Sequence, residues 1–150
     1  MKYFCIDYGL ARTGIAVSDP QGIMAFPRGT LELAKLGSRK ALLSALVNAV
    51  LTEEAHAVVL GLPLHKDGAE SLTTVQVKNI TARLKRRLHE HKPDLAFYFM
   101  PEFLSSEEAA ADLAAAGLAP ARRKAVLDQQ AAVRILESFL ALPEDRRLSA

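Results

Sequence analysis

Two runs of apolar residues, separated by one helix-length segment, constrain the fold of this chain most. Ala57–Leu60 is apolar at every position and continues into Gly61-Leu62-Pro63, and Leu95–Met100 is a second such run. Residues 71–90, between them, carry apolar side chains at helical spacing. Continuously apolar strands are typical of parallel sheets, in which both faces are covered. This part of the sequence therefore predicts a parallel strand–helix–strand unit inside an α/β domain.

The N-terminal part of the chain predicts a different arrangement, an antiparallel meander. Tyr3–Ile6 and Gly14–Ser18 are strand-like, and roughly Phe26–Leu33 can pair as a third strand after a turn at residues 19–22. Gaps this short favour hairpins. Helical patterns follow over Ser38–Glu54, over Ser71–Glu90, over Ser105–Gly117, and from the end of a basic loop at Ala119–Lys124 to about Leu142.

The predicted order is β-β-β-α-β-α-β-α-α. It gives a mixed five-stranded sheet, with three antiparallel strands followed by a βαβαβ half, flanked by helices. We expect one α/β domain over residues 1–142 and a frayed polar tail at residues 143–150. The 150-residue chain has a globular composition and a single cysteine, with neither a leader nor a membrane-length apolar run. We therefore expect a cytoplasmic protein without an internal disulfide.

Basic residues are unevenly distributed, although the formal net charge is only +2. Lys78–Lys92 contains several Lys and Arg residues against one acid, Glu90, and Arg122-Arg123-Lys124 forms a second cluster. Such patches can hold the phosphates of a nucleic acid. A solvated helix face explains the first patch equally well.

Three acids occupy positions that are unusual for a carboxylate. Asp7 directly follows the apolar strand Tyr3–Ile6, Glu102 follows the last predicted strand, and Asp128 lies on the apolar stripe of the final helix. Taken singly, they are explained as a turn residue, a solvated loop acid and a helix N-cap. However, the carboxyl ends of parallel strands meet at one edge of a sheet, and carboxylates that converge there repel one another unless cations lie between them. Such oxygen ligands suit Mg²⁺ or Mn²⁺, and two ions about 4 Å apart would activate a water for phosphodiester hydrolysis.

Four motifs, in order along the chain, resemble the YqgF family of RNase H-like proteins. They are Ile6–Asp19, Val59–Leu64 with Asp67-Gly68 and Glu70, Glu102 with Leu104-Ser105-Ser106 and Glu108-Ala109, and Asp128 with Ala131-Ala132 and Ile135-Leu136. The family is described as pre-16S rRNA nucleases and, earlier, as candidate Holliday junction resolvases. The resemblance covers nearly the whole chain. It implies an RNase H-like fold and identifies Asp7, Glu102 and Asp128 as catalytic acids that bind divalent metal.

The chain departs from the family pattern near two of these acids. The third motif usually opens Asp-Glu-Arg, whereas Pro101-Glu102-Phe103 stands here, and Gln129 replaces a lysine that often follows the last aspartate. The three carboxylates are kept. The loss of a neighbouring arginine would nevertheless weaken the electrostatic stabilisation of a phosphate.

Five basic residues are candidates for binding the substrate. Arg12 follows the glycine turn beside Asp7, and Lys66 lies in a turn-rich loop before a helix N-terminus, where backbone N–H groups can bind a phosphate. Arg122-Arg123-Lys124 lies in the basic loop before Asp128 and could clamp a nucleic-acid backbone without reading bases. The alternatives are a surface arginine for Arg12 and an ordinary strand–helix connection around Lys66.

The function that these observations favour is a metal-dependent endonuclease acting on structured RNA, at the 5′ side of precursor 16S rRNA. A second hypothesis keeps the same site but cuts branched DNA as a Holliday junction resolvase, which requires a homodimer; monomer and homodimer both stay open. A third is a nucleic-acid-binding protein whose catalysis has decayed, because of the changes at Pro101, Phe103 and Gln129. A phosphotransferase or ATPase related to actin-like kinases is disfavoured, because those proteins need two lobes and the chain provides one.

Overall fold

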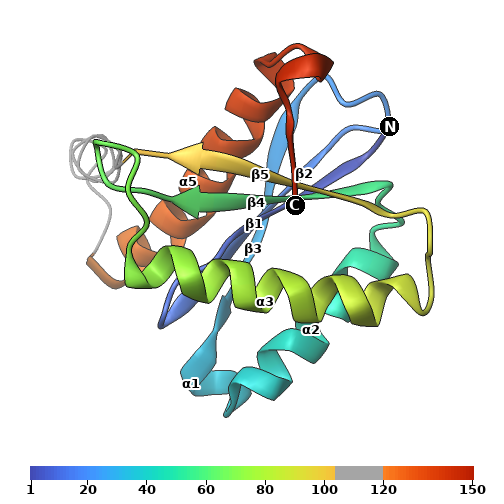
Figure 1. The fold of residues 1–150 in the computed structure, drawn as a ribbon. Helices are drawn as coiled ribbons and strands as arrows, with labels where there is room; N and C mark the ends of the chain where they lie inside the picture. The colour runs from blue at the N-terminus through green and yellow to red at the C-terminus, as the bar shows by residue number, and fades with distance from the viewer. Residues whose placement is uncertain (104–119) are drawn as a thin grey trace.

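A computed structural model describes residues 1–103 and 120–150, except for the side chains of residues 120–128 (Figure 1). Its single sheet has the strand order β3-β2-β1-β4-β5-β6. In chain order the strands are β1 (Tyr3–Asp7), β2 (Arg12–Ser18), β3 (Ala25–Glu32), β4 (Ala57–Pro63), β5 (Ala96–Glu102) and β6 (Leu148–Ser149). The helices are α1 (Leu33–Leu36), α2 (Arg39–Thr52), α3 (Leu72–His89), α5 (Pro120–Ala141) and the 3₁₀ turn η1 (Glu144–Arg146).

The pairing of the strands confirms the predicted mixed sheet. β1 pairs with β2 and β2 with β3 in antiparallel fashion, whereas β1 pairs with β4 and β4 with β5 in parallel. The predicted N-caps are also confirmed. Ser38 Oγ accepts the N–H of Ala41 at the start of α2, and Ser71 forms a capping box with Thr74 at the start of α3. Local signals therefore fix where these two helices begin.

Helices cover both faces of the sheet, as Figure 1 shows: α2 and α3 lie on one face and α5 lies on the other. Alternate side chains of each strand enter different clusters. Phe4 of β1 and Leu60 of β4 pack with α2 and α3, while Cys5 and Val59 pack with α5. Each central strand is thus buried on both sides, which explains its continuous apolar run.

The prediction of five strands was wrong by one, because the C-terminal tail adds a strand. β6 pairs antiparallel with the outer edge of β5, and the N–H of Ala150 donates to the carbonyl of Phe97 (2.9 Å). Arg147 lies over the rings of Phe139 (4.6 Å) and Tyr3 (5.5 Å), and donates to the hydroxyl of Tyr3 (2.9 Å). The expectation of a frayed tail at residues 143–150 was therefore wrong, because the open edge of β5 and a cation–π contact hold the tail.

Two further segments differ from the prediction. Residues Pro120–Lys124 were expected in a loop but form the beginning of α5, because proline is well tolerated in the first turn of a helix. The short helix α1, directly after β3, was not predicted. The helix expected over Ser105–Gly117 lies outside the described residues. Among the helices that are described, none has the length and apolar character needed to cross a membrane.

Candidate functional site

Asp7 and Glu102 both end parallel strands at the same edge of the sheet. Asp7 is the last residue of β1 and Glu102 the last residue of β5, with β4 between the two strands. Side chains alternate along a strand, so Asp7 shares a face with Cys5, and Glu102 shares a face with Met100. Cys5 and Met100 both belong to the cluster that packs against α5. The two carboxylates therefore stand on the α5 face, at the edge where α/β sheets bind ligands.

Gly61 of β4 leaves the space between these two strands open. A Cβ at this position would lie 2.7 Å from Ile135 Cδ1 of α5 and 3.6 Å from Glu102 Oε2. The carboxylate of Glu102 thus extends over β4 towards β1. Any larger residue at position 61 would press on α5 and occupy the space beside the Glu102 carboxylate.

Both carboxylates lie close enough to the thiol of Cys5 to act on it electrostatically. Burial raises the pKa of Cys5 well above its ordinary value, and the negative charges of Asp7 and Glu102 raise it further. Cys5 is fully buried in β1, on the face of the sheet that packs against α5. The negative charges of Asp7 and Glu102 therefore both act on the buried thiol of Cys5.

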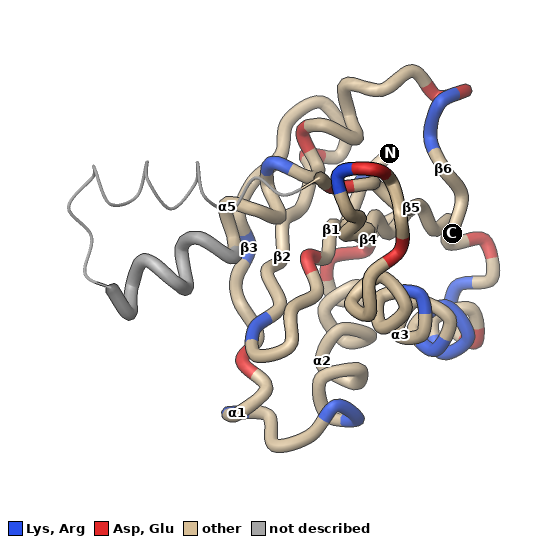
Figure 2. Tube along the Cα trace, turned by 60° about the vertical axis from the view of Figure 1, so that its left-hand side comes forward, with Lys and Arg blue, Asp and Glu red and all other residues tan. Residues whose placement is uncertain are grey.

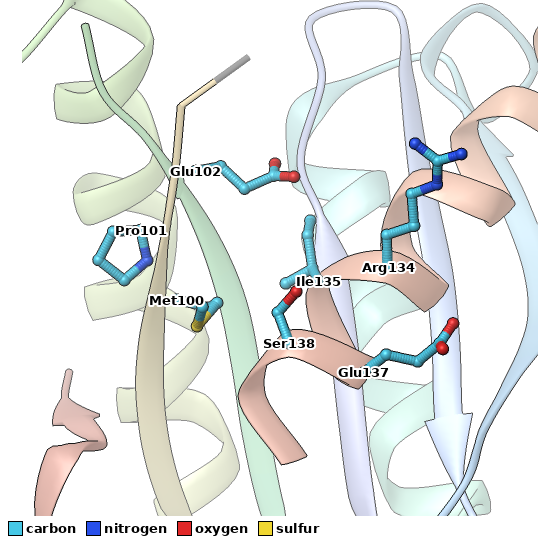
Figure 3. A pocket seen from close by; sticks show the side chains of 7 residues that line it. All are labelled: Met100, Pro101, Glu102, Arg134, Ile135, Glu137 and Ser138. Atoms are coloured by element: carbon cyan, nitrogen blue, oxygen red, sulfur yellow. The ribbon is translucent and has the colours of Figure 1, made fainter. Parts of the chain in front are cut away.

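Glu102 is partly desolvated, and this burial raises the pKa of its carboxyl group. It borders an open cavity of about 330 Å³ between the end of β5 and α5, together with Arg134 and Ser138. Figure 3 shows the Glu102 side chain extending from β5 towards α5, above Ile135. A carboxylate that is partly removed from water is costly unless a cation meets it. Two carboxylates on one edge supply the hard oxygen ligands that Mg²⁺ and Mn²⁺ prefer.

Asp128 lies on α5, in the first half of the helix. Helical spacing places position 128 on the same face as Ala132, Ile135 and Phe139, which are buried against the sheet. Its side chain lies outside the described part of the structure. Among the side chains that are described, no three His, Cys, Asp or Glu residues form a group that could hold a metal ion. The described chain thus brings two of the three expected acids together and places the helix that carries the third above them.

The expected substrate-binding residues lie on three different segments: the start of β2, the turn between β4 and α3, and the start of α5. Arg12 opens β2 directly opposite Glu32 of β3, and its charge helps to lower the pKa of that carboxyl, after the larger effect of Lys35. The turn before it is tight, since a Cβ on Gly9 would collide with the carbonyl oxygen of Arg12. Arg12 therefore lies near the acidic edge but beside another carboxylate.

Lys66 is exposed in a small turn that joins β4 to α3. Leu64 and Glu70 form an isolated bridge across this turn, and the N–H of Leu64 donates to the carbonyl of Glu102 (3.0 Å). The turn is thus fixed beside the candidate site. The cluster Arg122-Arg123-Lys124 lies in the first two turns of α5, and its side chains lie outside the described part of the structure.

The departures from the family pattern lie next to Glu102 and next to Asp128. Pro101 is part of β5 and pairs in register with Leu62 of β4, and Phe103 is 53% exposed just beyond the strand. Gln129 is partly buried on α5. None of these residues displaces Glu102 from the strand end. The role of Gly61 was not predicted, although a glycine inside an apolar strand is a signal of close approach by another group.

Comparison with known proteins agrees with this architecture. A family model described as "RuvX: Holliday junction resolvase" matches residues 1–142. A protein of Oleidesulfovibrio alaskensis is 53% identical over 99% of this chain and 97% of its own length. A protein of Nitratidesulfovibrio vulgaris is 52% identical over the full length of both chains. Both carry the curated name "Putative pre-16S rRNA nuclease".

Solved structures of similar fold come from RuvC. Thermus thermophilus RuvC in complex with a Holliday junction substrate has a TM-score of 0.59 at 10% identity, and a second T. thermophilus RuvC structure has a TM-score of 0.58 at 14% identity. Each comparison covers 100% of both chains. This likeness confirms the RNase H-like fold. The family match and the full-length relatives, on a sheet that gathers two carboxylates at one edge, show that the chain belongs to the RuvX family of nucleases, the YqgF family that its motifs resemble.

Proposed function

We propose that this protein is a divalent-metal-dependent endonuclease that acts on structured RNA in the cytoplasm and cuts the 5′ side of precursor 16S rRNA. The observation that carries the proposal is the reach of Glu102 over Gly61 towards β1, on the face where Asp7 ends its strand. The curated names of the full-length relatives support the choice of substrate. The proposed site consists of Asp7, Glu102 and Asp128.

In the proposed mechanism the three carboxylates would hold Mg²⁺ or Mn²⁺ at the carboxyl edge of the sheet. Such ions, when bound in pairs, activate a water and neutralise the charge that develops on the phosphate. The partial burial of Glu102 would favour cation binding, because a cation removes the cost of keeping its charge away from water. Lys66, exposed in the turn that is tied to the end of β5 by the hydrogen bond from Leu64 to Glu102, would hold a phosphate next to the one that is cut. Arg12 and the cluster Arg122-Arg123-Lys124 are the other proposed phosphate contacts.

The decisive experiment is a cleavage assay with Mn²⁺ or Mg²⁺ that compares precursor rRNA fragments with four-way DNA junctions. We expect cleavage of the RNA by the native protein and a loss of roughly a thousandfold or more in Asp7→Asn and Glu102→Gln, since metal ions contribute several kcal/mol and about 1.4 kcal/mol corresponds to tenfold in rate. A matched control is Glu90→Gln, which removes an exposed carboxylate at the C-terminal end of α3, far from this edge. Native rates in Asp7→Asn would exclude the proposed site.

The same assay tests resolution of Holliday junctions, which the description of the matching family favours. A resolvase must make two symmetric cuts and therefore needs a dimer. Symmetric cleavage of the DNA junction, together with a dimer in light scattering, would identify branched DNA rather than RNA as the substrate. Binding of RNA without metal-dependent cleavage of either substrate would instead identify a protein whose catalysis has decayed.

A further inference from the structure

A second cavity, of about 340 Å³, opens on the opposite face of the sheet, between α2 and α3. Its walls combine cationic side chains, side-chain amides and apolar groups, from the residue after β1 and from both helices. All of these residues are described, and none is acidic. The nuclease site described above uses none of them.

The charge of this cavity is strongly positive. Arg39 and Lys40 come from the first turn of α2, and Arg83 comes from α3. The N-terminal end of a helix already carries partial positive charge, so that acidic residues stabilise it and basic residues do not. No acid occupies the first turn of α2. Two cations at this position are unfavourable for the isolated helix but suitable for binding an anion.

Most other cations of α3 form ion pairs or hydrogen bonds within the protein, so the helix is not a uniformly solvated basic face. Lys78 pairs with Glu70, Lys85 donates to the carbonyl of Ala150 (2.8 Å), and Arg87 donates to Ser44 Oγ (3.1 Å). Figure 2 shows basic segments along α3 and at the start of α2. Arg83 is the α3 cation that lines the cavity.

The polar and apolar walls fit a nucleobase. Gln76 Oε1 is buried and has no hydrogen-bond partner among the described residues, and Asn79 lines the same cavity. Their amides can donate to and accept from the edge of a base. Tyr8, Leu43 and Ile80 provide the apolar surface against which a base can pack. Side chains that pair with base edges, pack against the base and neutralise a phosphate are the usual means by which proteins recognise unpaired RNA.

The cavity begins one residue away from the catalytic edge. Tyr8 directly follows Asp7, and it belongs to the cluster on the α2–α3 face, whereas Asp7 stands on the α5 face. An RNA strand whose phosphate is cut at Asp7 can therefore cross the sheet edge and bring a neighbouring nucleotide to this cavity.

We propose that this cavity binds one unpaired nucleotide of the RNA substrate, next to the cleavage site. Arg39, Lys40 and Arg83 hold its phosphate, and Gln76 and Asn79 pair with the edge of its base. This inference rests on the proposed function for the identity of the substrate. It adds a contact that selects RNA with a single-stranded flank over a fully paired end.

Fluorescence anisotropy in EDTA, which prevents cleavage, tests the proposal with a labelled RNA hairpin that carries or lacks a single-stranded flank. We expect the native protein to bind the flanked hairpin more tightly. Arg83→Ala should weaken binding of the flanked hairpin by about tenfold, which corresponds to about 1.4 kcal/mol, and should leave the blunt hairpin unchanged. Gln76→Glu, which has nearly the same shape but adds a negative charge, should have the same selective effect.

The matched control is Arg86→Ala, which removes an exposed positive charge from α3 that does not line the cavity. It should change the binding of both hairpins slightly and equally, and thermal melting should verify that each variant is folded. Equal effects of Arg83→Ala and Arg86→Ala would overturn the proposal, as would a native protein that does not distinguish the two hairpins. Binding is measured without metal, so the two proposals can fail separately. If the native protein prefers the flanked hairpin but does not cleave RNA, only the nuclease function is contradicted. If it cleaves RNA but binds both hairpins equally, only the nucleotide-binding cavity is contradicted.

Discussion

The two faces of the sheet are formed by the same strands but differ in the size of their side chains. On the α2–α3 face, β1 and β4 present Phe4, Ile6 and Leu60, which are almost completely buried. On the α5 face, β1 begins with Tyr3, but towards the carboxyl ends the same strands present the smaller groups Cys5 and Gly61. A larger apolar side chain buries more area and so contributes more to stability. The small groups on the α5 face let α5 approach closely and leave room for two carboxylates at the sheet edge.

The largest expected effect comes from removing a fully buried leucine on either face. Leu46 of α2 and Leu136 of α5 are both 0% exposed. Leu46→Ala and Leu136→Ala should each lower the free energy of unfolding by about 2–5 kcal/mol, measured by urea denaturation. At a temperature where both variants are folded, only Leu136→Ala should lower the nuclease rate, because α5 carries Asp128. Equal rates in the two variants would show that the division of roles between the faces is wrong.

A smaller effect is expected from filling the space at Gly61. Gly61→Ala places a methyl group against Ile135 and beside the carboxylate of Glu102, so it should destabilise the fold by about 1–3 kcal/mol. It should also lower cleavage by the folded protein. Adding Ile135→Val removes the nearest atom, Cδ1, and should restore most of the lost stability. If the double variant is no more stable than Gly61→Ala, the close approach of α5 is not the cause.

The C-terminal strand should contribute to stability and not to catalysis. Arg147→Ala removes the cation over Phe139 and Tyr3 and the hydrogen bond to the Tyr3 hydroxyl. We expect a loss of about 0.5–2 kcal/mol in unfolding free energy, with an unchanged cleavage rate. Arg147→Lys keeps the charge but not the planar group, and should recover part of the loss. A reduced rate in a fully folded Arg147→Ala protein would mean that the tail acts on the site.

The smallest expected effect is the change in stability that ionisation of Glu102 causes when no metal is bound. Burial raises the pKa of this group above the ordinary 4.5, so the folded protein holds the proton more tightly than the unfolded chain does. Its ionisation therefore lowers stability as the pH rises from about 4.5 through the raised folded pKa, and the loss persists above it. Glu102→Gln should be more stable than the native protein at neutral pH in EDTA, with the difference vanishing below pH 4.5.

Added Mn²⁺ should reverse this order in thermal melting, because the ion stabilises only a protein that retains the carboxylate. A native protein whose melting temperature is insensitive to Mn²⁺ would contradict a metal site at this edge.

The sequence alone determined the elements whose signals are local. The apolar runs gave the parallel strands, Ser38 and Ser71 marked helix starts, and strand ends placed Asp7 and Glu102 at one edge. These predictions succeeded because burial, capping and alternation act within a few residues along the chain. The motif resemblance added the RNase H-like fold, which the similar RuvC structures confirm. The roles of the three acids remain a proposal.

Only the tertiary structure decided which distant groups meet. The tail strand at Leu148–Ser149 has no apolar pattern of its own and exists because β5 leaves an open edge. The role of Gly61 depends on Ile135, which follows it by more than seventy residues in the printed sequence. The cavity between α2 and α3 likewise combines Tyr8, Arg39 and Gln76, which no short window of sequence contains together. Packing of one element on another creates these sites, and the free energy of packing depends on neighbours in space rather than along the chain.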